Sequence, residues 1–418
     1  MRFTPALLKH AEALLAELLR SSFAADSVVS HYFRMHRELG HNDRGFVAET
    51  VYAVLRRKRS LSARCLEDVT SRRLLLATLA CVRGLNRREL ESVLSESEVK
   101  WLAQAKAVRL DDLPPAVRLD LPDWLYERLA QQFDPAELEQ LAGSLNQSAP
   151  LDLRVNTLKA ERVAVLERLR ADGIDAEPCG WSPVGIRLAG KPSLSRHPLF
   201  LDGSIEVQDE GSQLLGFLLQ PKRGEMVADF CAGAGGKTLL LGAMMRSQGR
   251  LYAFDVAEKR LAKLKPRLAR SGLSNVHPVR IESEHDMRVK RLAGKLDRVL
   301  VDAPCSGLGT LRRNPDLKWR QTPDSVAELT AKQASILNAA ATLVKKGGRL
   351  VYATCSLLDS ENESVVSNFL ATHPEFVSSS AEEVLGKQGV TLGTGQRLRL
   401  LPHKHGTDGF FAAVMERQ

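Results

Sequence analysis

The sequence has no long hydrophobic run. In its 418 residues no stretch of about 18 apolar residues occurs, which excludes a membrane-spanning helix on sequence grounds. The first twenty residues place Lys9, Glu12, Glu17 and Arg20 in an amphipathic pattern, which differs from the apolar core of a secretory signal. We therefore expect a protein that remains in the cytoplasm and has no membrane partner.

Cysteine is also scarce. The six cysteines, at positions 65, 81, 179, 231, 305 and 355, are too few for a dense disulfide framework in so long a chain. No CxxC pair or Cys/His cluster has the spacing of zinc ligands. Reduced thiols and no metal site are expected. The sequence likewise shows no internal repeat and no low-complexity segment.

Acidic residues are outnumbered by basic ones. The chain has 59 Lys and Arg against 50 Asp and Glu, a formal net charge of +9. This balance favours a polyanionic partner such as nucleic acid, although it is also common on proteins that bind nothing acidic. A chain of this length with 44% hydrophobic residues is too long for one ordinary core, so two or three domains are expected.

The periodicity of apolar residues changes along the chain. Residues 1–143 show the three- and four-residue spacing of helices, with basic clusters at 55–60, 71–73 and 86–90. These clusters are either solvated helix faces or an RNA-contacting face. Residues 150–204 read as short strands around one helix, a small α+β domain. Residues 205–418 alternate strand and helix, which is typical of a doubly wound, mostly parallel sheet.

A glycine-rich loop follows the first strand of this last region, in "MVADFCAGAGGKT" (226–238). Without Cβ atoms the backbone of such a loop can approach a ligand closely. It is not a phosphate-binding P-loop, because Cys231 stands where that motif needs glycine. Nor is it GxGxxG, because Thr238 replaces the last glycine. A different nucleotide-like ligand is indicated; a structural turn and a dinucleotide dehydrogenase remain open alternatives.

Asp255 ends the next strand, "RLYAFD", 20 residues after Gly235. A carboxylate at the carboxyl edge of a parallel sheet can accept hydrogen bonds from both hydroxyls of a ribose. The loop and the acid together predict a ligand that contains a nucleoside.

Two thiols are expected at the same edge. "LDRVLVDAPCSG" (296–307) carries Asp302 and Cys305 past the end of a strand, and "GGRLVYATCS" (347–356) does the same for Cys355. A thiolate that adds to carbon 6 of a pyrimidine turns carbon 5 into a nucleophile that can attack the methyl group of a sulfonium donor. Release then needs a base near the first thiol, so two cysteines fit both demands.

These motifs resemble those of the Sun/Nop (RsmB-like) family of RNA cytosine-5 methyltransferases. The resemblance rests on "DFCAGAGGKT", on "LDRVLVDAPCSG" followed by "RRNPDLKWR", and on "VYATCS" followed by "SENE", and it covers about residues 150–418. The helical front, with "HNDRGFVAETVYAVLRRKRS", is similar to the NusB-like RNA-binding domain of bacterial members. The resemblance implies a NusB-like all-α domain (1–143), a small α+β domain (150–204) and a Rossmann-like methyltransferase domain (205–418).

The resemblance also implies roles for individual residues. Cys355 would be the nucleophile and Cys305 the cysteine that assists release, with Asp302 and Lys237 flanking the reacting base. S-adenosylmethionine would be the cofactor. Its predicted contacts are Cys231, Ala232, Gly233, Ala234, Gly235, Gly236, Lys237, Asp255, Asp302 and an acidic residue after the third strand. Counting points to Glu282 for that last residue, with Glu284 and Asp286 as competitors.

The glycine loop departs from the family pattern. The family's usual loop is CAAPGGK, whereas this chain reads "CAGAGGK" with Gly233 and Ala234. The loop is therefore expected to be less rigid, which leaves its cofactor affinity open without excluding function.

A basic stretch, residues 311–320, follows Cys305. Arg312, Arg313, Lys318 and Arg320 are predicted to contact RNA phosphates at the lip of the site. Trp319 in the same stretch is either a packing residue or a platform for a base.

Rival classes fit the motifs less well. An amino-group methyltransferase would need an Asn/Asp-Pro-Pro-aromatic turn in place of "DAPCS", and a DNA cytosine-5 enzyme would not need "TCS". The predicted function is methylation of carbon 5 of a cytosine in ribosomal RNA by a monomeric enzyme. A transfer RNA substrate, or a catalytically weak RNA-binding assembly factor, remains the alternative.

Overall fold

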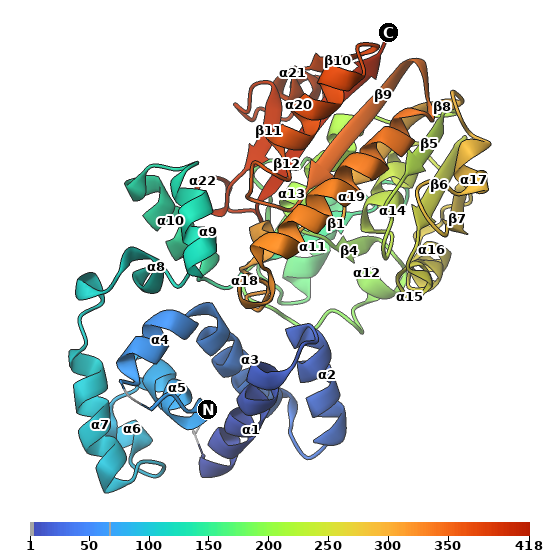
Figure 1. Ribbon diagram of the computed structural model, residues 1–418. Helices are drawn as coiled ribbons and strands as arrows, with labels where there is room; N and C mark the ends of the chain where they lie inside the picture. The colour runs from blue at the N-terminus through green and yellow to red at the C-terminus, as the bar shows by residue number, and fades with distance from the viewer. Residues whose placement is uncertain (1–3, 67) are drawn as a thin grey trace. The chain divides into compact units, whose positions relative to one another are not determined.

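The computed structural model describes residues 4–66 and 68–418, which divide into two compact units (Figure 1). The helical unit comprises the chain through Ser148 together with Thr310–Pro323. The sheet unit comprises Ala149–Gly309 and Asp324–Gln418 and holds both β-sheets of the described chain. The helical N-terminal region is thereby confirmed; its likeness to NusB stays a prediction.

The described part of the helical unit consists of short helices and turns. Their bounds are α1 (Pro5–Arg20), α2 (Ala25–Met35), α3 (His41–Arg56), α4 (Lys58–Arg64), α5 (Ser71–Ala77), α6 (Arg87–Leu90), α7 (Glu96–Ala107), α8 (Pro115–Arg118), α9 (Asp123–Ala130), α10 (Pro135–Leu145) and α18 (Leu317–Arg320). A π-helical turn (Thr78–Val82) extends α5, and a 3₁₀ turn (Leu110–Asp112) follows α7.

The start of α1 shows why these helices form where they do. The Thr4 side chain accepts a hydrogen bond from the Leu7 N–H at 3.3 Å, and Pro5 occupies the first helical position, where its missing N–H costs nothing. The apolar stripe of α1 then packs against α3 and α5, with Leu14, Val47 and Leu75 fully buried. The apolar spacing read from the sequence therefore marks the faces that meet in this core.

The basic stretch at 311–320 belongs to the helical unit, which the sequence did not indicate. The Lys318 ammonium donates to the Arg56 carbonyl at 2.7 Å and to the Asn146 side chain at 2.8 Å. The Trp319 indole N–H donates to the Leu55 carbonyl at 2.7 Å. These bonds, all within one unit, dock the segment on the helices.

This docking corrects part of the predicted phosphate-binding set. Lys318 is 1% exposed and Arg312 is 6% exposed, because both side chains are used to pack the segment. They have no surface to offer a phosphate in this arrangement. Arg313 is half-buried and Arg320 is exposed, so these two remain accessible.

The small sheet of the sheet unit has the order β2-β3-β1-β4, with every pairing antiparallel. Its elements are β1 (Leu151–Val155), α11 (Arg162–Ala171), β2 (Ala176–Pro178), β3 (Gly185–Leu188), α12 (Pro198–Leu201) and β4 (Ile205–Val207). The last strand lies beyond the predicted boundary at residue 204. A pattern of three residues is too short to show in the sequence that it pairs with β1.

The large sheet has the order β10-β12-β9-β8-β5-β6-β7, with β11 paired to β12. Its strands are β5 (Met226–Asp229), β6 (Arg250–Asp255), β7 (Val276–Arg280), β8 (Leu296–Asp302), β9 (Val344–Thr354), β10 (Phe376–Ser379), β11 (Arg397–Leu400) and β12 (Phe410–Arg417). Strands β5 to β9 pair in parallel, and β12 is antiparallel to its neighbours. The predicted mostly parallel α/β fold is confirmed.

Helices cover both faces of this sheet (Figure 1). One face packs against α13 (Glu210–Leu219), α14 (Gly236–Met244) and α21 (Ala381–Gly386), and the other against α19 (Pro323–Ala341) and α20 (Glu363–Thr372). In β9, Val351 and Ala353 face the first layer while Leu350 and Tyr352 face the second. A strand buried on both faces must be apolar throughout, which explains the run "RLVYAT".

The two sheets are joined by buried polar contacts. The Arg154 guanidinium donates to the Gly236 carbonyl at 2.6 Å, and the Asn156 amide donates to the Ser271 carbonyl at 2.9 Å. Glu206 in β4 pairs with Arg267 and Arg270 of α16 (Leu264–Ser271). The small α+β region is thus part of one compact unit with the large sheet and its helices. Among the described residues no helix is long and apolar enough to cross a membrane.

We predict that Lys318 makes the stability of the helical unit depend on pH. Burial lowers the pKa of Lys318 to about 7, whereas in the unfolded chain it is near 10.4. Between these values the unfolded state binds the extra proton, so the free energy of unfolding should rise with pH, on the order of 1 kcal/mol per pH unit. Urea unfolding from pH 7 to 9 measures this slope, and Lys318→Met should reduce it. Equal slopes in both proteins would contradict the assignment.

Candidate active site

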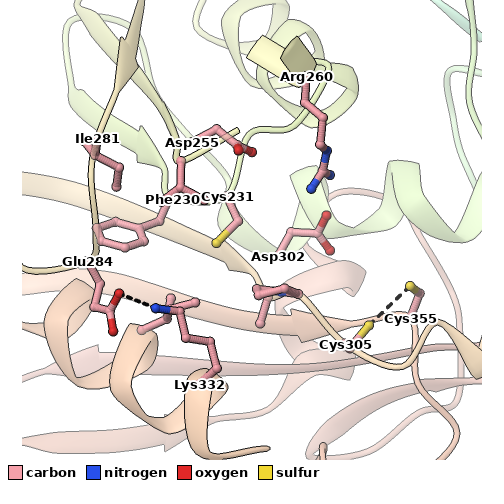
Figure 2. A pocket seen from close by; sticks show the side chains of 14 residues that line it. Phe230, Cys231, Asp255, Arg260, Ile281, Glu284, Asp302, Cys305, Lys332 and Cys355 are labelled. Carbon is pink, nitrogen blue, oxygen red and sulfur yellow. Dashed lines mark hydrogen bonds and ion pairs between the residues drawn. The ribbon is translucent and has the colours of Figure 1, made fainter. Parts of the chain in front are cut away.

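A cavity of about 350 Å³ opens at the carboxyl edge of the parallel strands (Figure 2). Its lining comes from the ends of β5, β6, β7, β8 and β9 and from α19: Phe230, Cys231, Asp255, Val256, Arg260, Ile281, Glu284, Asp302, Ala303, Pro304, Cys305, Lys332, Ile336 and Cys355. A smaller cavity of about 190 Å³ lies against the glycine loop and shares Cys231, Arg260 and Asp302 with the first.

The glycine loop runs from Phe230 to the start of α14 in a conformation that only glycine adopts freely. Gly233 has φ +56° and Gly235 has φ +82°. A Cβ on Gly235 would lie 2.2 Å from a methyl carbon of Leu264, so the loop also packs too closely for a side chain there. The loop therefore needs glycine for its turn and for its contact with α16.

Asp255 holds the glycine loop in place. One carboxylate oxygen accepts from the Gly233 N–H at 2.7 Å, and the other accepts from the Ala257 N–H at 2.7 Å. Each oxygen keeps a further lone pair, and the carboxylate lines the cavity. Asp255 is thus placed for the predicted ribose contact and has a second task that the sequence did not reveal, because it ties the loop to β6.

Lys237 and Asp302 form a half-buried ion pair beside the loop, with 2.7 Å between Nζ and Oδ2. Burial alone would lower the pKa of Lys237, but the charge of Asp302 and the hydrogen bond to it outweigh that and raise it. Lys237 is therefore a permanent cation at this end of the site. The structure thus brings the two predicted residues together: Lys237 lies in the first turn of α14, and Asp302 ends β8.

The two cysteines meet at the far end of the larger cavity. The Cys305 and Cys355 sulfurs are 3.4 Å apart, close enough for a hydrogen bond between thiols (Figure 2). That bond, burial and the charge of Glu361 raise the pKa of the Cys305 thiol well above its usual value. The surroundings therefore favour a retained proton on Cys305.

The sheet with these thiols matches a family of known methyltransferases. Residues 216–416 match the family described as 16S rRNA methyltransferase RsmB/F, and residues 121–195 match the ferredoxin-like domain of RsmF/B-like proteins. The chain is 34% identical over 97% of its length to a probable ribosomal RNA small subunit methyltransferase B of Synechocystis sp., covering 98% of that protein. The chain belongs to the RsmB/F family.

Other similar proteins agree with this. A probable ribosomal RNA small subunit methyltransferase B of Bacillus subtilis is 35% identical over 71% of this chain and 66% of its own length. Among solved structures, that of PH0851 superposes with a TM-score of 0.80 and 27% identity, covering 100% of both chains. A methyltransferase homologue from Pyrococcus horikoshii superposes with a TM-score of 0.63 and 30% identity over 74% of this chain and 100% of its own.

Membership in the RsmB/F family makes the protein an RNA methyltransferase, and the predicted cofactor, S-adenosylmethionine, is confirmed. The ferredoxin-like match begins at residue 121, within the helical unit, whereas the sequence pattern placed the start of the small domain at 150. The sequence pattern does not show a domain boundary at residue 121, because α9 and α10, which follow it, have the same helical periodicity as the preceding region.

The residues around the cavity of this RsmB/F-family protein fit such a cofactor. Phe230 and Ile281 offer apolar surfaces near Asp255, as an adenine ring requires. In the smaller cavity, Asp229 accepts from the Thr238 hydroxyl at 2.7 Å, but among the described residues its other oxygen has no hydrogen-bond partner. An ammonium group of the cofactor would satisfy it. Burial raises the pKa of Asp229 to about 6.

The acidic residue after β7 differs from the predicted one. Glu282 is exposed and does not line the cavity, whereas Glu284 does. Glu284 accepts from the Lys332 ammonium and the Ser335 hydroxyl, each at 2.6 Å (Figure 2). Burial would raise the pKa of Glu284, but these bonds outweigh it and lower the pKa to about 2. Asp286 instead caps α17 (Met287–Lys290) and pairs with Arg288.

Sequence reasoning missed three groups at the site. Arg260 lines both cavities, and Lys332 reaches the larger one from α19. Neither stands in a recognisable motif. The third group is Glu361, which the short stretch "SENE" contains and which bonds to the serine after each cysteine. In the sequence this stretch indicates only the family resemblance, and the one further signal for Glu361 is that it lies six residues after Cys355.

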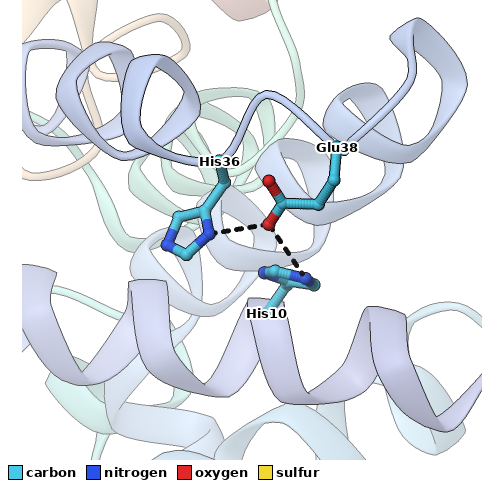
Figure 3. Close-up of side chains that lie close together, drawn as sticks. All are labelled: His10, His36 and Glu38. Atoms are coloured by element: carbon cyan, nitrogen blue, oxygen red, sulfur yellow. Dashed lines mark hydrogen bonds and ion pairs between the residues drawn. The ribbon is translucent and has the colours of Figure 1, made fainter.

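A separate cluster of possible metal ligands lies in the helical unit (Figure 3). The donor atoms of His10, His36 and Glu38 lie within 4.8 Å of one another. The Glu38 carboxylate is 2.9 Å from His36 Nδ1 and 3.9 Å from His10 Nε2, and His10 Nδ1 is 3.0 Å from the Tyr32 hydroxyl. These contacts join α1 to the turn after α2, which is a structural role.

We predict that Gly235→Ala destabilises the sheet unit more than Gly190→Ala. Both glycines have φ near +80°, so each substitution should cost about 1–2 kcal/mol of backbone strain. Gly190 has open space around its missing Cβ, whereas the Cβ of the residue at 235 would press on Leu264 and add about 1–3 kcal/mol.

Urea unfolding of the two variants measures the difference, and calorimetry with S-adenosylmethionine should show weaker binding for Gly235→Ala only. Equal destabilisation of both variants would show that the Leu264 side chain moves away from the added Cβ without a loss in the free energy of unfolding.

Proposed function

We propose that the protein transfers a methyl group from S-adenosylmethionine to carbon 5 of a cytosine in small-subunit ribosomal RNA, through a covalent bond between Cys355 and carbon 6. The observation that carries the proposal is the pair of sulfurs 3.4 Å apart in the same cavity as Asp255. Nucleoside-binding and nucleophilic groups thus share one space, which a methyl transfer between two bound molecules requires.

Cys355 is the proposed nucleophile. Its sulfur bonds to carbon 6 of the cytosine, and the electron pair of the ring double bond makes carbon 5 nucleophilic. We assign to the Lys237 ammonium the stabilisation of the negative charge that the reaction places on this sulfur. S-adenosylmethionine supplies the electrophilic methyl group to carbon 5. Asp302 holds Lys237 at 2.7 Å and so keeps the cation in place.

Release reverses the covalent bond. The proton on carbon 5 must leave, and its electron pair re-forms the ring double bond while the bond between carbon 6 and the Cys355 sulfur breaks. Cys305 is the titratable group next to that sulfur. Because its pKa is raised, its thiolate, formed once the thiol proton has passed to solvent, is a base strong enough to take the proton from carbon 5, and this transfer restores the Cys305 thiol. We assign Cys305 to this second step.

The choice of ribosomal RNA rests on the relatives, which are named as small-subunit ribosomal RNA methyltransferases. A catalytically weak assembly factor fits less well, because both cysteines line one cavity with Asp302, and Asp302 pairs with Lys237. A cytoplasmic location and a monomeric state stay predictions.

The two thiols should behave differently when removed. Cys355→Ala should abolish both methylation and any covalent RNA adduct, because carbon 5 is not activated without the attack. Cys305→Ala should transfer a methyl group once and then accumulate as a covalent complex with its methylated RNA. A denaturing gel of each variant with ribosomal RNA and S-adenosylmethionine distinguishes them.

A shifted band for Cys305→Ala alone supports the assignment, the reverse exchanges the two roles, and no band in either contradicts covalent catalysis by this pair. Cys179→Ala serves as the control, because that thiol is buried in the small sheet region and outside both cavities.

We further propose that the helical unit binds RNA. Removing residues 1–140 is a poor test of this, because the deletion would strip Lys318 and Trp319 of the carbonyls that they bind. Surface substitutions are cleaner. Arg87 and Arg88 are exposed in one of the basic clusters found in the sequence.

Arg87→Glu with Arg88→Glu should weaken RNA binding and reduce the slope of log affinity against log salt by about 1–2. The reason is that binding releases fewer counterions from the RNA for each phosphate contact that is lost. The control is Lys222→Glu with Arg223→Glu, two exposed residues that precede β5 at the opposite edge of the sheet from the cysteines. Filter binding across a salt series measures both. Equal effects of the two double variants would contradict a specific role for the helical unit.

A further inference from the structure

Each catalytic cysteine is followed by a serine, and both serines bond to one buried carboxylate. Glu361 accepts from the Ser306 N–H at 2.8 Å and from the Ser306 hydroxyl at 2.5 Å. The Glu361 oxygen that accepts from the Ser306 hydroxyl, Oε2, also accepts from the Ser356 hydroxyl. Glu361 is fully buried. A single side chain therefore joins the residue after Cys305 to the residue after Cys355.

The carboxylate is itself held rigidly. The Gln333 amide of α19 donates to Glu361 at 3.0 Å and to the Pro304 carbonyl at 3.0 Å. The Tyr352 hydroxyl donates to the Glu361 backbone carbonyl at 2.6 Å. The neighbouring Asn362 donates to the Ser356 carbonyl at 3.0 Å. A buried charge surrounded by donors on every side resists movement, because each lost bond would leave a polar group unpaired.

The ladder between β8 and β9 does not reach the sulfurs. The register ends at Asp302 opposite Ala353, and the Ala303 N–H makes one further bond to the Ala353 carbonyl at 2.8 Å. Past that point a backbone hydrogen bond from the Gly309 N–H to the Cys355 carbonyl, at 2.8 Å, also ties the two cysteine loops. Side-chain contacts also join the two Cys-Ser segments: the Cys305 and Cys355 sulfurs are 3.4 Å apart, the Ser306 and Ser356 hydroxyls are 3.2 Å apart, and both hydroxyls bond to Glu361.

We propose that Glu361 is the positioning residue that sets the separation of the two catalytic sulfurs, by holding Ser306 and Ser356 on one carboxylate. The catalytic consequence rests on the proposed function; the effect on thiol geometry does not. Methyl transfer and release both need sulfur atoms placed accurately over carbons 6 and 5 of one ring, and an error of about 1 Å can cost about 100-fold in rate.

The charge of Glu361 adds a second effect of the same placement. It acts on Cys305 and raises its pKa. The carboxylate that holds Ser306 therefore also favours the protonated form of the neighbouring Cys305 thiol.

The thiol geometry can be tested without any methylation assay. Phenylarsine oxide forms one arsenic–sulfur bond to each of two neighbouring thiols and releases water, so its affinity depends on the distance between the sulfurs. We expect tight binding by the full-length protein, a single-thiol baseline for Cys305→Ala and Cys355→Ala, and about tenfold weaker binding for Glu361→Ala.

A matched control separates positioning from simple stability. Glu210 is also a buried carboxylate, and it accepts backbone hydrogen bonds from Trp181 and Ser182, the latter at 2.8 Å, outside the cavities. Glu210→Gln should lower the unfolding temperature but leave arsenical binding unchanged. Glu361→Gln keeps one acceptor oxygen and should fall between wild type and Glu361→Ala.

Turnover supplies the second readout. Glu361→Ala should lower kcat for RNA methylation by about 100-fold while the KM for RNA and the affinity for S-adenosylmethionine stay unchanged. The proposal would be overturned if Glu361→Ala bound phenylarsine oxide as tightly as wild type, or if Glu210→Gln lost as much affinity for phenylarsine oxide as Glu361→Ala. If wild type binds the arsenical and Glu361→Ala does not, but neither methylates cytosine, then the proposed function fails and the positioning role stands.

If Glu361→Ala does not fold, Ser306→Ala and Ser356→Ala each release one loop while the carboxylate remains. Either should weaken arsenical binding, and wild-type binding by both would overturn the proposal.

Discussion

The site depends on one topological constraint: parallel strands end at the same edge of a sheet. Strands β5, β6, β8 and β9 pair in parallel, so Asp229, Asp255, Asp302 and Thr354 end their strands side by side. The glycine loop and the cysteine loops follow these ends directly. Residues more than 100 positions apart in the chain, such as Cys231 and Cys355, therefore line one cavity. Burial of both sheet faces under helices keeps this edge as the open place for a ligand.

The low solvent exposure of charged side chains determines which contacts they make at that edge. Lys237 and Asp302 neutralise each other, and Glu361 is surrounded by hydroxyl, amide and backbone donors. Asp229 has an oxygen without a partner among the described residues. A buried carboxylate costs free energy unless its hydrogen bonds are satisfied, so an unsatisfied one marks a ligand contact and a satisfied one marks a rigid support.

The helical unit and the catalytic fold are interleaved along the chain. After Gly309 the chain leaves the cysteine loop, contributes Thr310–Pro323 to the helical unit, and returns at Asp324. The contributed segment is fixed there by Lys318 and Trp319. Thr310, where the contributed segment begins, is five residues after Cys305 in the chain.

The sequence by itself determined the elements and the chemistry that follow from local pattern. The helical front, the mostly parallel sheet, the glycine loop and the strand-end residues Asp255, Asp302, Cys305 and Cys355 were readable, because glycine turns, apolar runs and strand-end polar residues are properties of short segments. Lys237 was indicated by the family resemblance, and its pairing with Asp302 came from the structure. Only the tertiary structure decided which charged side chains are buried. It placed Lys318 inside the helical unit, turned Glu284 rather than Glu282 into the cavity, paired β4 with β1, and set Glu361 between two loops. Each of these outcomes depends on contacts between residues far apart in the chain. The identity of a charged residue does not show whether the folded chain will place hydrogen-bond donors next to it.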